Sequence, residues 1–455
     1  MWANINIAEL KMVISRKYLK RQLFFCLCIV IYKLVLDAYY VIFSGDFAYY
    51  GVVYDPRGSL EILAAWLCVV SSTFFVDFSD KKVSNSVHLL LYIVCFVPST
   101  VIYTFNSTVE GSFFYGLFSV FLAVGILQKV FDSKIALKQF SMSRRQFIFV
   151  LSSIYIALGL VVLSKYGLSF NMPDIGDVYT QRKEFKAIES SKFVKYALSW
   201  LASVLNLALV LYATINRKYV LLFFGLIGVS YFYSLGGHKS YLFAVPFAIA
   251  IMILVKLLRK DFNLSLALFL SFGLLLLLVF DQFSTKGYSL TSSLFVRRSL
   301  LLPSQIYYYY CEFYEQNGIN FFAHNFPFSS FLTSTYAETA PVVIGREYFG
   351  FNDDVYANGN VFADVFHNAG YLGYVLMAII LPGLYLAIDY VCANKNRLFT
   401  IPMVFMAFHV LINTGLFVSL ITHGIVLSLF VIGMYPNMYH RITQKIATNL
   451  NVNLA

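Results

Sequence analysis

Long apolar runs separated by short polar stretches make up most of the chain beyond residue 22. A helix that crosses a bilayer needs roughly 20 consecutive, mostly apolar residues. About twelve windows meet that requirement: 22–43, 59–78, 86–105, 112–131, 147–166, 196–215, 219–236, 240–258, 262–283, 369–391, 398–414 and 417–435. The pattern predicts an all-α polytopic membrane protein with about twelve transmembrane helices, arranged as a single transmembrane domain over residues 1–455.

Composition supports this fold class. Of the 455 residues, 59% are hydrophobic and only 13% are charged. The mean hydropathy is +0.72. Soluble domains carry about twice that share of charged residues, so a soluble globular fold is excluded.

The placement of basic residues predicts the orientation. Most of the 34 Lys and Arg residues lie in alternate connections and in the two ends of the chain, which hold few acids. The positive-inside rule therefore predicts that both termini are cytoplasmic. The net charge of +11 follows from this topology. It favours contact with anionic membrane lipids and argues against nucleic acid as a partner.

Two connections on the opposite side are long: residues 167–195 and 284–368. Long connections that are not disordered usually carry function. The larger one is rich in aromatic residues, which favour the membrane surface. We therefore expect interfacial helices along "LTSSLFVRRSLLLPSQIYYYYCEFYEQ", residues 290–316, with a break near Pro303.

The stretch "NGNVFADVFHNAGYLGYVL", residues 358–376, places ionisable residues directly before a hydrophobic window. A helix that begins near Val361 would carry Asp364 and His367 on one face, since they are three positions apart. Gly370 and Gly373 continue that spacing and would allow close helix packing. An acid in the first turn of a helix would also complement the helix dipole.

Five segments resemble the oligosaccharide repeat unit polymerases of bacteria, the O-antigen polymerase (Wzy) family. They are "DVYTQRKEFK", "SLGGHKSYLFAVPF", "VRRSLLLP", "YAETAPVVIGREYFG" and "NGNVFADVFHNAGYLGYVL". The resemblance covers about residues 165 to 380. It implies a GT-C-like glycosyltransferase of the bacterial inner membrane, in which 167–195 and 284–368 are the small and large periplasmic loops.

Such an enzyme joins undecaprenyl-pyrophosphate-linked oligosaccharides at the periplasmic face, as a step in making lipopolysaccharide or capsule. A flippase and a chain-length regulator are the further partners that the resemblance implies. The leaving pyrophosphate needs fixed cations, and arginine binds phosphate oxygens with two parallel hydrogen bonds. A general base must take the proton of the attacking hydroxyl. No acidic pair of the DxD kind stands on this side, so we expect no metal and no cofactor.

Candidates for each role lie in the two long connections and at the turn that follows window 219–236. Those for the pyrophosphate are Arg182, His238, Lys239, Arg297, Arg298 and Arg346. Glu338, Asp364 and His367 compete as the base. Asn358 and Asn360 could bond sugar hydroxyls.

Structural roles compete with these assignments. Arg182 could pair with Glu184 or Glu189, and Arg346 with Glu338 or Asp353. Arg297 and Arg298 diverge by about 100° on a helix, so one faces inward and the other faces the interface; we favour Arg298 for the site. Lys239 could extend to the membrane surface.

Charge inside the first window has a simpler explanation. Lys33 and Asp37 are four residues apart and are expected to pair, which offsets the cost of burying them.

Three other functions remain open. A flippase for lipid-linked oligosaccharides would carry cations along a central cavity and have short loops on both sides. An O-antigen ligase would share the large periplasmic loop but transfer the glycan to lipid A core. An assembly scaffold would need no chemistry.

Overall fold

The computed structural model describes residues 16–130, 140–168, 170, 178–258, 261–324, 334–350 and 356–437. Parts of the two long connections, residues 171–177, 325–333 and 351–355, lie outside the described residues, and with them Asp353.

All regular structure in the described residues is helical. The elements are α2 (Arg16–Asp46), η1 (Ala48–Tyr50), α3 (Ser59–Thr73), α4 (Ser84–Leu91), η2 (Tyr92–Phe96), α5 (Val97–Phe105), α6 (Gly111–Val130), α7 (Arg144–Tyr166), α8 (Val178–Ala187), α9 (Lys192–Trp200), η3 (Leu201–Leu205), α10 (Asn206–Asn216), α11 (Tyr219–Gly236), α12 (Lys239–Leu258), α13 (Phe262–Asp281), α14 (Leu290–Ser292), η4 (Ser293–Leu301), α15 (Leu302–Asn317), α16 (Ala340–Phe349), α17 (Val361–Ala369), α18 (Tyr371–Cys392), α19 (Arg397–Phe408), η6 (His409–Ile412), α20 (Leu416–Ile421) and α21 (Ile425–Met434).

Ten helices in the described part of the chain are long and apolar enough to cross a membrane, so the chain is a multi-pass α-helical membrane protein. The two remaining windows form shorter apolar helices, Ser59–Thr73 and Arg397–Ile412. At 1.5 Å per residue, each is about 22–24 Å long, less than the roughly 30 Å of a hydrocarbon core. The structure therefore supports ten of the twelve predicted spans by length.

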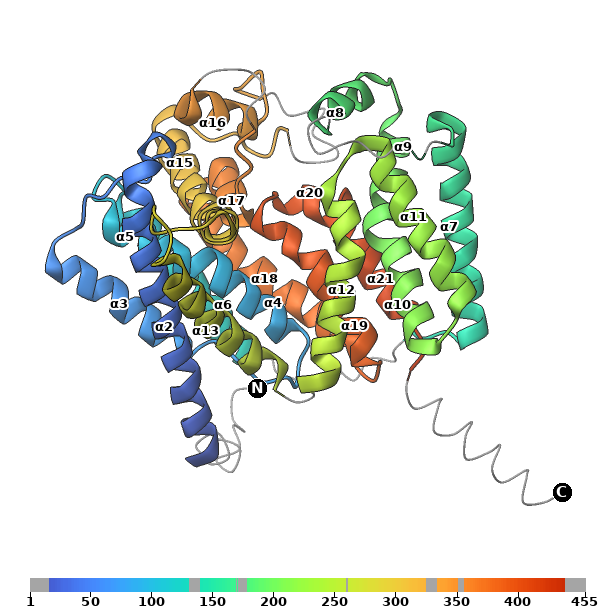
Figure 1. Ribbon diagram of the computed structural model, residues 1–455, viewed down its shortest axis with the longest axis horizontal. Coiled ribbons are helices and arrows are strands. Elements are labelled where there is room, and N and C mark those ends of the chain that lie inside the picture. Colours follow the sequence, from blue (N-terminus) through green and yellow to red (C-terminus); the bar gives the residue numbers. More distant parts are fainter. Residues whose placement is uncertain are drawn as a thin grey trace.

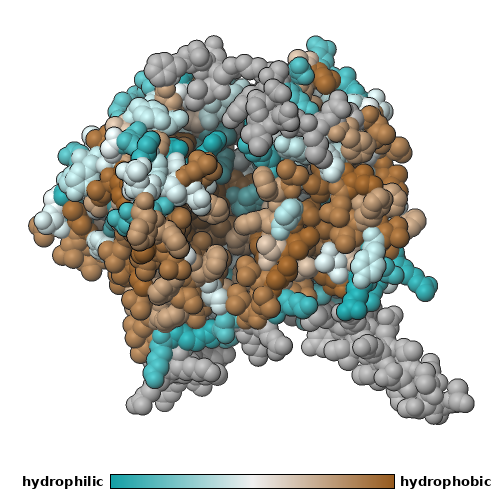
Figure 2. Space-filling model, viewed as in Figure 1, coloured by the Kyte–Doolittle hydropathy of each residue, from teal (hydrophilic) through white to brown (hydrophobic). Residues whose placement is uncertain are grey.

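The surface is divided as a membrane protein requires. On the face seen in Figure 2, a broad hydrophobic band crosses the molecule, and hydrophilic residues gather above and below it. The start of α2, the α18–α19 connection and the end of α21 lie at the lower edge in Figure 1, whereas α8, α16 and the end of α15 lie at the upper edge. This arrangement agrees with the predicted division of the connections into two sets.

The assignment of each edge to one side of the membrane can be tested with reporter fusions. A reporter fused after Arg397 is expected to be active only in the cytoplasm, because this connection belongs to the basic set. A reporter fused near Gln316, at the exposed end of α15, should be active only outside the cytoplasm. The opposite pair of results would invert the orientation and contradict every external role proposed below.

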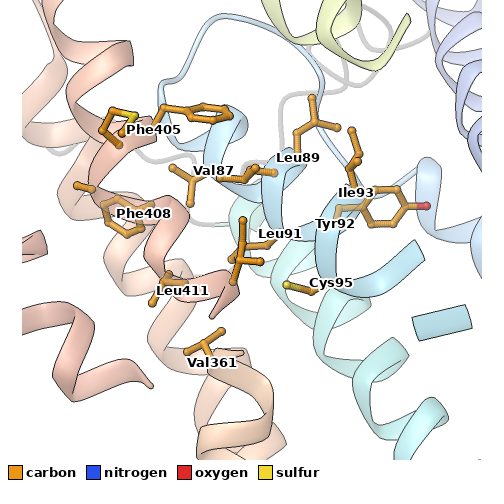
Figure 3. Packing of buried hydrophobic residues seen from close by; sticks show 14 of the residues in the cluster. Val87, Leu89, Leu91, Tyr92, Ile93, Cys95, Val361, Phe405, Phe408 and Leu411 are labelled. Carbon is orange, nitrogen blue, oxygen red and sulfur yellow. The ribbon is translucent and has the colours of Figure 1, made fainter. Parts of the chain in front are cut away.

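The core is built around the continuous span Ser84–Phe105, which α4, η2 and α5 form. In the most apolar part of this span, 94% of the residues are buried. Val87 and Leu91 of this span face Phe405, Phe408 and Leu411 of α19 and η6 (Figure 3). Val361, the first residue of α17, lies next to the same cluster in Figure 3. The short helix α17 is thus anchored in the hydrophobic core.

The predicted pair in the first span is confirmed. Lys33 Nζ lies 2.8 Å from Asp37 Oδ2, and the lysine side chain is fully buried. The ammonium also lies 4.1 Å from the centre of the Trp66 ring, in α3. A carboxylate and an aromatic face together compensate the burial of this charge.

The prediction of a helix break near Pro303 is wrong. Helices α14, η4 and α15 follow one another without interruption from Leu290 to Asn317. The nine residues of η4 form a π-helix directly before the proline. A proline ring collides with the carbonyl one turn earlier, and the wider π turn gives it space. The π segment η2 stands before Pro98 in the same way.

The prediction of a surface location is also wrong for α15, because its tyrosines enter the protein interior. Tyr307, Tyr308, Tyr310 and Tyr314 are each at most 2% exposed. Three of the hydroxyls donate to backbone carbonyls: Tyr307 to Phe113 (2.8 Å), Tyr308 to Ser99 (3.0 Å) and Tyr310 to Ala357 (2.9 Å). A tyrosine can be buried when its hydroxyl has such a partner.

Candidate functional site

Helix α17 begins where the sequence predicts, and Asn360 is its N-cap. The side-chain Oδ1 of Asn360 accepts hydrogen bonds from Phe362 N and Ala363 N, both at 3.0 Å. Asn360 is fully buried. The expected contact of Asn360 with a sugar is therefore replaced by a capping role, which asparagine commonly has at this position. Asn358, two residues earlier, is exposed.

Asp364 and His367 share one face of α17, as predicted. His367 Nδ1 lies 3.7 Å from Asp364 Oδ1. Both side chains are nearly inaccessible, at 5% and 1% exposure. Neither therefore reaches solvent from its position in the structure.

The carboxylate of Asp364 links α17 to a distant part of the chain. Its Oδ2 accepts a hydrogen bond of 2.8 Å from Leu416 N, the first residue of α20. Gly415 packs so closely that an added Cβ would lie 2.6 Å from the same oxygen. Asp364 thus stabilises the start of α20, a role for which the spacing within residues 358–376 gives no signal.

His367 is held as a neutral imidazole. Its ring lies 5.0 Å from that of Tyr314 and 5.8 Å from that of Tyr310, between centroids. Burial lowers the pKa of His367 to about 3, although two backbone hydrogen bonds oppose the shift. A histidine with this pKa is uncharged at neutral pH and is a weak base.

Asn368 is a residue that the sequence analysis missed. Its Nδ2 donates to Asp364 O (2.8 Å), while its Oδ1 accepts from Phe322 N (2.9 Å). The backbone oxygen of Asn368 accepts from Phe321 N at 3.1 Å. Phe321 and Phe322 both have positive φ, at 46° and 63°. Two adjacent aromatic residues in this region are strained, so Asn368 fixes an unfavourable turn beside α17.

Gly370 and Gly373 have different roles. Gly370 separates α17 from α18 with φ of 56°, so it serves the turn. The prediction of close helix packing is confirmed for Gly373. A Cβ added at Gly373 would overlap the carbonyl oxygen of Val365 and would lie 2.8 Å from the carbonyl carbon of Val365.

Gly373→Ala is expected to destabilise the protein by about 1–3 kcal/mol, because the backbone of α17 cannot move away as a side-chain end could. Gly383, on the same helix, has no atom within 4 Å of an added Cβ. Gly383→Ala should therefore leave the melting temperature in detergent unchanged or raise it slightly. Equal melting temperatures for the two variants would refute the tight contact between α17 and α18.

Arg182, His238 and Lys239 form a second group, where α8 meets the turn between α11 and α12. Arg182 Nη2 donates to Gly237 O at 3.0 Å. Gly237 ends α11 with φ of 59°. Arg182 therefore interacts favourably with the carboxyl end of a helix. His238 is half-buried, while Lys239 is exposed at the start of α12.

The adjacent arginines of η4 diverge as expected, but the prediction that Arg298 is the inward-facing one is wrong, because Arg297 has that position. Its guanidinium lies 4.0 Å from the centre of the Phe47 ring, and its Nε donates to Ser293 Oγ at 3.2 Å. Arg298 is exposed. Of the two, Arg298 is thus the one whose guanidinium lies open to a ligand.

Glu338, which lies two residues before α16, forms an ion pair with Arg346 within that helix. The distance from Arg346 Nη1 to Glu338 Oε2 is 2.7 Å, and the side chains are 51% and 36% exposed for Arg346 and Glu338. This confirms one of the two alternatives for Arg346. It also makes Glu338 the most accessible of the three carboxylate and imidazole candidates.

These groups occupy separate elements at one edge of the molecule. Helix α8 lies to one side of this upper edge and α16 to the other, with α17 below α16 (Figure 1). Figure 2 shows the surface hollowed between the two sides. The structure thus brings Asp364 next to His367 and Glu338 next to Arg346, and places Arg182 beside the turn with His238 and Lys239.

Within the residues that the structure describes, no three His, Cys, Asp or Glu side chains gather closely enough to hold a metal ion. Comparisons with models of protein families, with curated proteins and with solved structures found no match to this chain.

Proposed function

We propose that the protein is a membrane glycosyltransferase that polymerises oligosaccharide units carried on undecaprenyl pyrophosphate. One observation carries the proposal. The large connection contributes the exposed Arg298 and the partly exposed Glu338, and the turn between α11 and α12 contributes the exposed Lys239. Helices α8 and α16 lie on opposite sides of a recess in the same edge of the molecule. Transfer from a pyrophosphate carrier needs cations for the leaving group and one base for the acceptor.

The roles can be divided by accessibility. Arg298 and Lys239, both exposed, bind the pyrophosphate. Arg182 positions α8 against the end of α11 through Gly237. Glu338 accepts the proton of the attacking hydroxyl, while Arg346 orients its carboxylate. The buried Asp364 and His367 hold α17 beneath the recess rather than contact substrate.

In the reaction, a hydroxyl at the non-reducing end of the incoming unit attacks the reducing-end sugar of the growing chain. The bond from that sugar to the pyrophosphate breaks, and the proton passes to Glu338. Attack from the side opposite the leaving group inverts the anomeric centre. In this proposal the fold is GT-C-like, the recess faces the periplasm of a bacterial inner membrane, and catalysis needs no metal.

A flippase is less well supported by the described residues. It would need cations exposed along a cavity through the spans, yet Lys33 is fully buried against Asp37 and Trp66. The proposed cations instead lie outside the apolar part of the spans. An O-antigen ligase would use the same recess with another acceptor, so only the product distinguishes it from a polymerase.

The proposal is tested by reconstituting the purified protein in liposomes with undecaprenyl-pyrophosphate-linked units. The expected product is a ladder of lipid-linked chains, formed equally in EDTA because arginine and lysine stabilise the leaving group. A product restricted to lipid A core would favour the ligase. Absence of any glycan transfer by folded protein, or activity that EDTA removes and Mg²⁺ restores, would contradict the mechanism.

A further inference from the structure

A cavity of about 1010 Å³ lies at the opposite edge of the molecule from α8. The first turn of α7, the turn between α10 and α11, and the residues that follow α21 line it. The 18 residues of α11 separate this cavity from Gly237, a distance of about 27 Å. Met142 N donates to Met434 O at 3.1 Å, which joins two of these walls.

The cavity is strongly basic. Arg144, Arg145, Arg217 and Lys218 line it, and its described lining contains no Asp or Glu. Four like charges around one space repel one another, and an anion placed between them would remove that repulsion. Phosphate oxygens suit the paired donors of arginine.

Arg217 has a backbone conformation that favours glycine, which indicates a functional role for its side chain. Arg217 ends α10 with φ of 55°. The following residue, Lys218, donates its N–H to Ala213 O at 2.8 Å, as in a helix-ending turn that favours glycine. An arginine in this conformation is strained, and such strain is retained mainly where a side chain has a function.

The cavity lies at the start of a span whose sides are largely exposed. Only 17% of the apolar part of α7 is buried within the protein, so this span has the largest lipid-facing share of the ten. Phe149, Ile156 and Leu160 are 72%, 59% and 62% exposed along it. Acyl chains can lie along this side while a head group occupies the basic cavity at the end of the helix.

We infer that this cavity binds the phosphate of an anionic phospholipid. The inference is independent of the proposed glycosyl transfer, because the cavity lies at the other end of α11 from the recess. It goes beyond general attraction of basic loops to the membrane, since three separate segments line one cavity.

The test compares melting temperatures of the full-length protein in detergent with and without phosphatidylglycerol. The wild-type protein should gain several degrees with phosphatidylglycerol and much less with phosphatidylcholine, which has the same phosphate but no net charge. Arg217→Gly removes the side chain and restores the residue that the backbone prefers. Without lipid this variant should be at least as stable as the wild type, yet it should lose at least half of the lipid-dependent gain.

Lys256→Ala is the matched control, since Lys256 is an exposed cation at the same edge but outside the cavity. It should keep the full gain. A full gain in Arg217→Gly, or an equal loss in Lys256→Ala, would overturn the site. Inorganic pyrophosphate without lipid should produce no comparable gain; an equal gain would assign the cavity to a soluble phosphate compound and overturn the lipid source.

Discussion

Arg298→Ala is expected to slow polymerisation by about 10²- to 10³-fold, the usual cost of removing one fixed donor from a developing negative charge. Arg298 is exposed on η4, so its removal should leave the fold unchanged. Lysine should restore little activity, because a point charge cannot replace the paired donors of a guanidinium.

The measurement is the chain-length distribution of surface glycan in cells, together with the rate of ladder formation in liposomes. Cells with Arg298→Ala should display glycans one unit long, since export and ligation of single units do not need the polymerase. Lys286→Ala, another exposed cation of the same connection, should behave like the wild type. If Arg298→Ala instead stopped the export of single units while the protein remained folded, the flippase would replace the polymerase.

Glu338→Gln is expected to reduce the rate by about 10²- to 10⁴-fold, the range for loss of a general base. Glutamine keeps the size of the side chain, and the ion pair that it removes is partly exposed, so the melting temperature should change little. Glu347→Gln changes an exposed acid on α16, next to Arg346 in the sequence, and serves as the control. The measured quantity is the ladder-forming rate at saturating lipid-linked substrate.

The variant Asp364→Asn tests whether Glu338 or Asp364 is the general base. Asp364 accepts a hydrogen bond from Leu416 N, so the variant should lower the melting temperature. Its activity, corrected for folded protein, should fall less than that of Glu338→Gln. The reverse order, with Glu338→Gln active and folded Asp364→Asn inactive, would move the base to α17.

The spans that the sequence predicts well are those in which hydropathy alone decides. Residues 219–236 form α11 with the predicted bounds, because a run of apolar residues in lipid must satisfy its own backbone as a helix. The ends of the helices within residues 59–78 and 398–414 were harder to predict. Their hydropathy resembles that of a span, but α3 ends at Thr73 and η6 at Ile412. Packing and turns decide such ends, and a sliding window does not detect them.

In the candidate site and in the first span, contacts that depend on helical geometry were predictable. Asp364 and His367 share a face, Lys33 pairs with Asp37, and Arg297 diverges from Arg298. Each follows from 3.6 residues per turn, which acts between near neighbours in the sequence.

The fold class, most of the spans, the division of charge between two edges and the relative directions of neighbouring side chains thus follow from the order of residues along the chain. Which polar groups are buried depends instead on the tertiary structure. Asp364 is bound by Leu416, and Tyr308 by Ser99, although these partners are 52 and 209 residues apart in the chain. Burial depends on which distant segments pack together, and a polar side chain can be buried only where such a segment supplies its hydrogen bond.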